Sequence, residues 1–135
     1  MGKVDFRSHK VQLSVPVEKA YLFLHDLNNL RKIMPEQVIN WNSTEDSCSF
    51  DIKGMTHLSL KREEAIPGQL IRIISSPDNP IGLEIRGNLE KEEDQQTAAW
   101  IELTADLSPM LQLLASQPLQ NLVNIMAERL KEAAI

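Results

Sequence analysis

The three histidines have the widest chemical range of any residues in this chain, because imidazole can bind a metal or transfer a proton near neutral pH. His9, His25 and His57 lie far apart, and none has a second histidine or a cysteine at the spacing typical of a zinc site. His25 and Asp26 are adjacent and could form a pH-tuned pair, but Asp26 also suits the N-cap of a helix. We therefore predict no metal, no cofactor and no catalytic residue.

Charged side chains within the expected strands are the second group that could supply acid–base chemistry. They are Lys61, Arg72, Glu84, Arg86 and Glu102. Each alternates with the apolar positions of its own strand, as Glu84 does with Leu83 and Ile85. If the apolar positions face the core, the charges form ion pairs on the outer face of the sheet. A register slip of one residue would reverse both faces.

Sulfur and aromatic side chains are better suited to packing than to reaction. Cys48 alternates with Phe50 and Ile52, so it is expected to be a small buried hydrophobe without a basic partner. Trp41 either fills the core or lines the mouth of a pocket, and the core is the simpler expectation. Flexible thioethers can fill gaps or line an adaptable pocket; the relevant residues are Met34, Met55, Met110 and Met126.

Composition narrows the class of protein. The 135 residues predict a single domain, residues 1–135. A net charge of −5, with only two tryptophans, one tyrosine and three phenylalanines, argues against a nucleic-acid partner. One cysteine excludes an internal disulfide and favours the cytoplasm. No signal peptide and no membrane span are evident. Oligomeric state and protein partners leave no signal in the sequence.

The elements that would position these residues follow from periodicity and turn residues. Residues 3–15 predict one strand, irregular near Ser8. A short helix follows Pro16, and a second, capped by Asp26, ends before Pro35. About six alternating segments then predict an antiparallel meander, with a type II turn at residues 67–68.

The last element is a long amphipathic helix from Ser108 to Ile135. Ser108 suits its N-cap and Pro109 its first position. The expected buried stripe is Leu111, Leu114, Leu119, Leu122, Met126 and Leu130. Pro118 lies inside this helix and is expected to kink or split it.

Three segments carry a resemblance to a known superfamily: VPVEKAYLFLHDLNNLRKIMP, IPGQLI and SPMLQLL…LVNIMAERLKEAA. With the order of elements, they make the chain similar to the Bet v 1-like, START-related helix-grip proteins (SRPBCC, polyketide cyclase-like). The resemblance implies an α+β fold, in which a curved antiparallel sheet of about seven strands surrounds a long C-terminal helix. Two short helices follow the first strand. This superfamily includes carriers of apolar ligands, cyclases, dehydratases and co-chaperones, so the fold alone does not select a function.

The apolar inner face favours non-catalytic binding of a small apolar or amphipathic molecule between sheet and helix. The expected ligand-binding residues are Trp41, Phe50, Leu60, Ile73, Ile85, Leu103, Leu114 and Met126. Two alternatives remain open. One is a cyclase or dehydratase on the same fold, which would need His57, Glu84 or Glu102 to be buried with a shifted pKa. The other is a co-chaperone-like interaction module without a cavity, which an exposed apolar patch on the outer face of the sheet, with Trp100 as its candidate, would favour.

Overall fold

A computed structural model describes residues 2–54, 56–79 and 81–133, so Met55 and the last two residues of the expected C-terminal helix lie outside it. The elements are β1 (Gly2–Arg7), β2 (Val11–Leu13), α1 (Val17–His25), η1 (Leu27–Ile33), β3 (Val38–Ser43), β4 (Ser47–Ile52), β5 (Thr56–Ile66), β6 (Leu70–Ser75), β7 (Gly82–Glu93), β8 (Gln96–Leu107) and α2 (Pro109–Ala133). This order confirms the helix-grip expectation.

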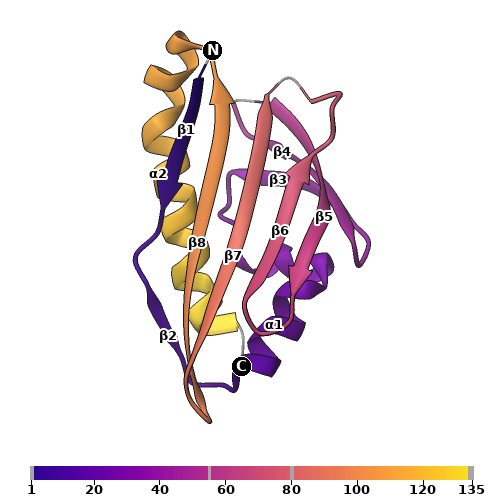
Figure 1. Cartoon of the computed structure of the whole chain (residues 1–135). Coiled ribbons are helices and arrows are strands. Elements are labelled where there is room, and N and C mark those ends of the chain that lie inside the picture. The colour runs from indigo at the N-terminus through magenta and orange to yellow at the C-terminus, as the bar shows by residue number, and fades with distance from the viewer. Residues whose placement is uncertain (1, 55, 80, 134–135) are drawn as a thin grey trace.

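The sheet is antiparallel throughout the described strands, in the order β1-β8-β7-β6-β5-β4-β3, with β2 also paired to β8. Helix α2 lies along one face, against β8, β1 and β2 (Figure 1). Helix α1 packs on β6 and β7, while the 3₁₀ helix η1 contacts α2. Helices α2, α1 and η1 therefore pack against different parts of the sheet.

The N-terminal strand is divided in two, where the sequence predicted one strand with an irregularity near Ser8. β1 pairs with one half of β8 and β2 with the other half. Between them, the backbone N–H of Ser8 donates to the Ile101 carbonyl at 2.9 Å, and the Ile101 N–H donates to the Ser8 hydroxyl at 2.9 Å. Buried Ser8 thus supplies the hydrogen bonds of a regular ladder at the break.

The predicted cap and turn are confirmed. The Asp26 carboxylate accepts a hydrogen bond from the Asn28 N–H at 3.0 Å, so Asp26 caps η1. Gly68 has φ +73°, and the Gln69 N–H donates to the Ile66 carbonyl at 2.9 Å. A positive φ at the third turn position is what a type II turn requires, and glycine adopts it without strain.

The core lies between the sheet and α2, as strand alternation predicts. Leu83, Ile85, Ile101 and Leu103 are buried. The same face carries Cys48, Phe50, Leu58, Leu60, Ile71 and Ile73. Helix α2 contributes Ala115, Leu119, Leu122, Val123, Met126, Ala127 and Leu130.

Helix α2 differs from expectation in two ways. It is not split, because it runs without interruption through Pro118, and the expected kink remains a prediction. Leu111 and Leu114 are not buried: Leu111 is half-exposed and 69% of Leu114 is exposed. For Leu114 the reason is angular. At 3.6 residues per turn, the five-residue step from Leu114 to Leu119 rotates the side chain by about 140°. Ala115 occupies the buried position instead. Met110, expected as a gap-filler, is also exposed.

Strand β3 forms one edge of the sheet and carries a bulge between Ile39 and Asn42. Asn40 lies within the bulge with φ +56°, a left-handed conformation that asparagine tolerates better than most residues. Its side-chain amide donates to the Asp51 carboxylate at 2.7 Å, which ties the bulge to β4.

Candidate ligand-binding groove

Two apolar hollows lie along α2, and together we call them the α2 groove. The first has a volume of about 300 Å³ and is lined by Pro35, Gln37, Val38, Ile52, Lys53, Pro118, Leu119, Asn121, Leu122 and Ile125. The second has a volume of about 410 Å³ and is lined by Gly54, Thr56, Ile81, Leu107, Leu111, Leu114, Ala115 and Pro118. Pro118 lines both hollows, and the consecutive residues Lys53 and Gly54 line one each.

Local sequence explains the walls of the groove. The chain turns after β4 at Gly54, whose φ of +81° lies in the left-handed region that favours glycine. The Lys53 N–H donates to the Gln37 carbonyl at 2.8 Å, which holds this turn beside the segment before β3. On the opposite wall, Leu111 and Leu114 of α2 line the second hollow, and the angular offset of Leu114 from the buried stripe keeps it out of the core.

The groove is chemically simple. Lys53 is the one charged side chain among the described residues that line either hollow. The other polar side chains are Gln37, Asn121 and Thr56. No carboxylate and no histidine lines the described walls, so the groove holds no acid–base pair. It is suited to apolar contact with a few oriented polar groups, as small-molecule sites generally are.

Six of the eight residues predicted from the sequence lie in the packed core. They are Phe50, Leu60, Ile73, Ile85, Leu103 and Met126. The space around Ile73, Ile85 and Met126 is only about 20 Å³, close to the volume one water molecule needs. The structure therefore brings these six together as packed neighbours.

The other two predicted residues lie apart from that core group. Leu114 lines the second hollow of the groove. Trp41 is half-buried and stacks on Phe50, with ring centroids 5.3 Å apart and an interplanar angle of 10°. The Trp41 Nε1–H donates to the Ser43 hydroxyl at 2.9 Å, so this indole has a polar partner at the surface.

Sequence reasoning missed most of the groove, including Lys53, Gln37 and Asn121. Two signals for the groove were nevertheless present in the sequence: a proline within the helix, and Leu114, which is out of phase with the buried stripe. Both indicate a helix that leaves part of its apolar surface uncovered. The residues before β3 and after β4 could not be found this way, because they lie at strand ends that only the tertiary fold brings to α2.

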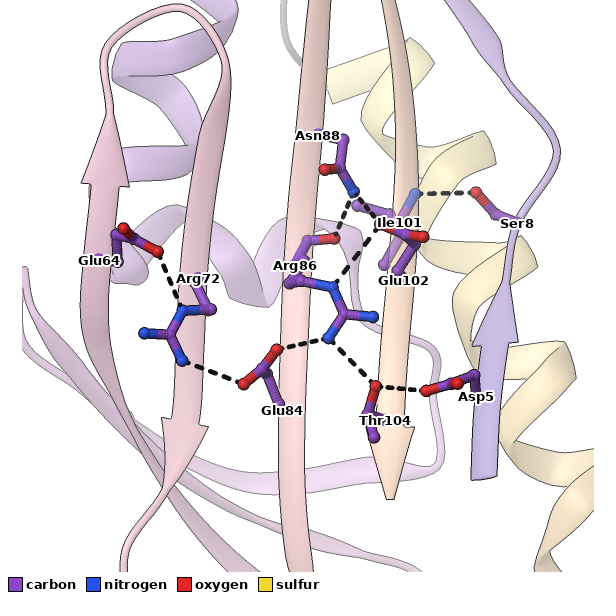
Figure 2. Close-up of polar contacts among 10 residues, drawn as sticks. All are labelled: Asp5, Ser8, Glu64, Arg72, Glu84, Arg86, Asn88, Ile101, Glu102 and Thr104. Atoms are coloured by element: carbon purple, nitrogen blue, oxygen red, sulfur yellow. Dashed lines mark hydrogen bonds and ion pairs between the residues drawn. The ribbon is translucent and has the colours of Figure 1, made fainter. Parts of the chain in front are cut away.

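Four of the five strand charges, Arg72, Glu84, Arg86 and Glu102, lie on the outer face of the sheet, as predicted, and form with Glu64 a continuous chain of ion pairs (Figure 2). Arg72 lies between Glu64 at 3.2 Å and Glu84 at 3.1 Å. Arg86 contacts Glu84 at 2.5 Å and Glu102 at 3.6 Å. Each of these side chains is partly exposed, so the arrangement is a surface network on the side opposite the groove helix.

The network keeps its central carboxylate ionised. Partial burial raises the pKa of Glu84, but hydrogen bonds and charge from Arg86 and Arg72 outweigh it, and the pKa is lowered overall. Hydrogen bonds from Arg72 to Glu84 and Glu64 raise the pKa of the arginine. A carboxyl with a lowered pKa is a poor proton donor near neutral pH, which argues against general acid catalysis at Glu84.

The histidines and the cysteine lie outside the groove lining. His9 Nε2 lies 2.5 Å from Glu128 Oε1, and His57 Nδ1 lies 2.6 Å from Asp51 Oδ1, both near the surface. Hydrogen bonds from Asn40 and His57 lower the pKa of the Asp51 carboxyl.

The remaining histidine, His25, lies beside Tyr21, with ring centroids 5.5 Å apart and the planes tilted by 44°. Burial raises the pKa of the Cys48 thiol to about 12. Within the described ranges, no cluster of three or more His, Cys, Asp or Glu side chains could hold a metal ion.

No protein-family model and no curated protein sequence matches this chain. Solved structures do match. A conserved protein from Geobacillus kaustophilus superposes with a TM-score of 0.73 at 15% identity, over 97% of this chain and 95% of the other. A START superfamily protein from Mycobacterium smegmatis gives 0.66 at 13% identity, over 96% and 97%. Norcoclaurine synthase from Thalictrum flavum gives 0.67 at 7% identity, over 97% and 86%.

The matching structures include an enzyme and a protein named only by its START superfamily. The structural likeness therefore defines the architecture of this chain and not its activity. In the part of the chain that the structure describes, no helix is both long and apolar enough to cross a membrane. The order of elements and the match over nearly the whole chain agree with the resemblance noted in the sequence. The chain has the helix-grip fold, which it shares with the START superfamily protein and with norcoclaurine synthase.

Proposed function

We propose that this protein binds a small apolar or amphipathic molecule without catalysis, in the α2 groove between the helix and the sheet. The observation that carries the proposal is the pair of apolar hollows that share Pro118. Their volumes, about 300 and 410 Å³, fall within the range of small-molecule sites. The exposed faces of Leu111 and Leu114 supply apolar surface that a ligand would remove from water.

The driving force for such binding is apolar burial. Each 100 Å² of apolar surface removed from water contributes about 2.5 kcal/mol before the cost of immobilising the ligand. An open, largely preformed groove keeps that cost low, because few side chains need to be reordered.

The site proposed here differs in place from the interior cavity expected from the sequence. Leu114 belongs to both sets of residues. Ligand contact at the other seven residues remains a prediction. A ligand would reach the six core residues among them only by displacing their packed neighbours. The cytoplasmic location also remains a prediction.

An enzyme of the cyclase or dehydratase type is less well supported. The described groove walls carry no carboxylate or histidine, and Glu84 and Glu102 lie in the ion-pair network on the other face. The fold likeness to norcoclaurine synthase shows that the architecture can host an enzyme, but no described pair of side chains in the groove could move a proton.

Two matched tryptophan variants test the proposal with Nile red, an uncharged fluorescent probe. Leu114 lines the second hollow, whereas neighbouring Leu113 does not line it and is 87% exposed. We expect the wild type to bind Nile red, Leu114→Trp to bind it at least severalfold more weakly, and Leu113→Trp to bind it unchanged. Absence of binding by the wild type, or equal effects of the two variants, would refute the groove as the site.

An interaction role is the second candidate, and one observation favours it. Met110 and Leu113 expose apolar side chains on the first two turns of α2, outside the lining of both hollows. Clustered apolar surface of this kind often marks a protein contact. The test is sedimentation velocity at several protein concentrations. If Nile red fails to bind, if the wild type self-associates as its concentration rises, and if the Met110→Ser/Leu113→Ser variant does not, the interaction role takes first place.

A further inference from the structure

The α2 groove is divided by polarity along its length. The first hollow is lined by Lys53, Gln37 and Asn121, residues whose side chains end in an ammonium and two amides. The second is walled by aliphatic side chains, with Thr56 as the only polar side chain among its described lining residues. Its aliphatic members are Ile81, Leu107, Leu111, Leu114 and Ala115. One end thus offers a cation and hydrogen-bond donors, and the other offers mainly apolar contact.

The charge at the polar end has no counter-ion in the described structure. No carboxylate lines either hollow, and no ion pair within 4.0 Å involves Lys53 among the described residues. Elsewhere on the molecule, Arg72 and Arg86 are each paired with two carboxylates. Lys53 is therefore the one cationic side chain among the described lining residues that would attract an anion to the groove.

We propose that the ligand is a single-chain amphiphile with an anionic head, taken up as a monomer from solution. Its head contacts Lys53 in the first hollow, and its chain passes Pro118 to lie along Leu111 and Leu114 in the second. This inference rests on the proposed function and adds the chemical class of the ligand. Gln37 and Asn121 donate hydrogen bonds to the same head, which orients the ligand along the groove.

A pair of ligands with one alkyl chain and different heads tests this directly. Dodecanoate carries a carboxylate, whereas dodecanol is uncharged, and each is used below its aggregation limit to displace Nile red from the full chain. We expect the wild type to prefer dodecanoate by about two- to fivefold, the range of an ion pair at an exposed site. Added salt should reduce this preference, because exposed charges are screened.

Lysine variants assign the preference to one side chain. In Lys53→Gln we expect dodecanoate and dodecanol to bind equally, with dodecanol affinity as in the wild type. In Lys53→Glu the order should reverse. Lys61→Gln is the matched control, because Lys61 is an exposed lysine on β5 outside the lining of both hollows. It should retain the wild-type preference.

The outcomes separate this inference from the proposed function. Equal binding of both ligands by the wild type, or a preference that survives in Lys53→Gln, overturns the anionic head and leaves the apolar groove standing. Failure of both ligands and of Nile red overturns the groove itself. A third outcome is that monomeric dodecanoate fails to bind, the wild type cosediments with vesicles of anionic phospholipid, and Lys53→Gln does not. That result would overturn uptake from solution and make Lys53 a membrane contact.

Discussion

Replacing Leu122 and Leu130 separately by alanine compares two buried leucines on one helix that differ in what surrounds them. Leu130 is 0% exposed and lies in the core, whereas Leu122 is 8% exposed and lines the first hollow. Each change removes about three carbons from an apolar environment, at about 0.8 kcal/mol per carbon, or about 2.4 kcal/mol. The difference lies in the space left behind.

At Leu130 the lost volume becomes a closed cavity. A cavity of roughly 80–100 Å³ adds about 2 kcal/mol at about 24 cal/mol per Å³, so we expect a total of about 4–5 kcal/mol. At Leu122 the lost volume joins a hollow that is already open to solvent, so the cavity contribution is small. We expect Leu122→Ala to cost about 2–3 kcal/mol, about 2 kcal/mol less than Leu130→Ala.

Urea unfolding followed by tryptophan fluorescence and far-UV circular dichroism measures both free energies. Coincident transitions from the two signals establish two-state behaviour, and an unchanged m-value shows that the difference arises in stability. Equal costs within about 0.5 kcal/mol, or a larger cost at Leu122, would mean that the first hollow is closed in solution. That result would remove the physical basis of the groove.

Three further expectations concern the network, the helix and the thiol. The folded-state pKa of Glu84 is lowered, so its ionised carboxylate contributes stability above the unfolded pKa of about 4.3, and this stability is lost as the pH falls through the folded-state pKa. In Glu84→Gln, the melting temperature should therefore fall less steeply on the acid side of a plot against pH. An unchanged plot would contradict the network. A chain ending at Asp106 lacks every core residue of α2 and should show no cooperative urea transition, whereas a sharp one would disprove the grip of the sheet on the helix. The buried Cys48 thiol, with its pKa raised to about 12, should react with a disulfide reagent only at the rate of unfolding, and rapid reaction of the native protein would show that it is accessible.

Much of the fold could be predicted from local patterns. Alternation along β7 and β8 assigned Leu83, Ile85 and Leu103 to the core, and the same alternation assigned Glu84 and Glu102 to the outer face. These predictions succeeded because a strand has a fixed period of two, so one correct apolar position determines every neighbour.

The candidate site was harder to predict because it depends on how elements meet. The stripe assigned to α2 included Leu111 and Leu114, although helical geometry does not place Leu114 and Leu119 on one face. The walls contributed by Gln37 and Lys53 lie at strand ends, which carry no periodic signal. Whether six buried apolar residues enclose a space or fill it depends on side-chain packing, which the sequence pattern does not contain.

The bulge at Asn40 has a consequence for how copies of this protein behave toward one another. An open sheet with a regular edge strand presents a row of unpaired N–H and C=O groups, onto which another chain can add as a further strand. In β3 the register shifts between Ile39 and Asn42, and the left-handed residue within it redirects the backbone at mid-strand. An incoming strand would therefore lose its alignment after a few residues, so the edge that α2 leaves open is a poor template for aggregation.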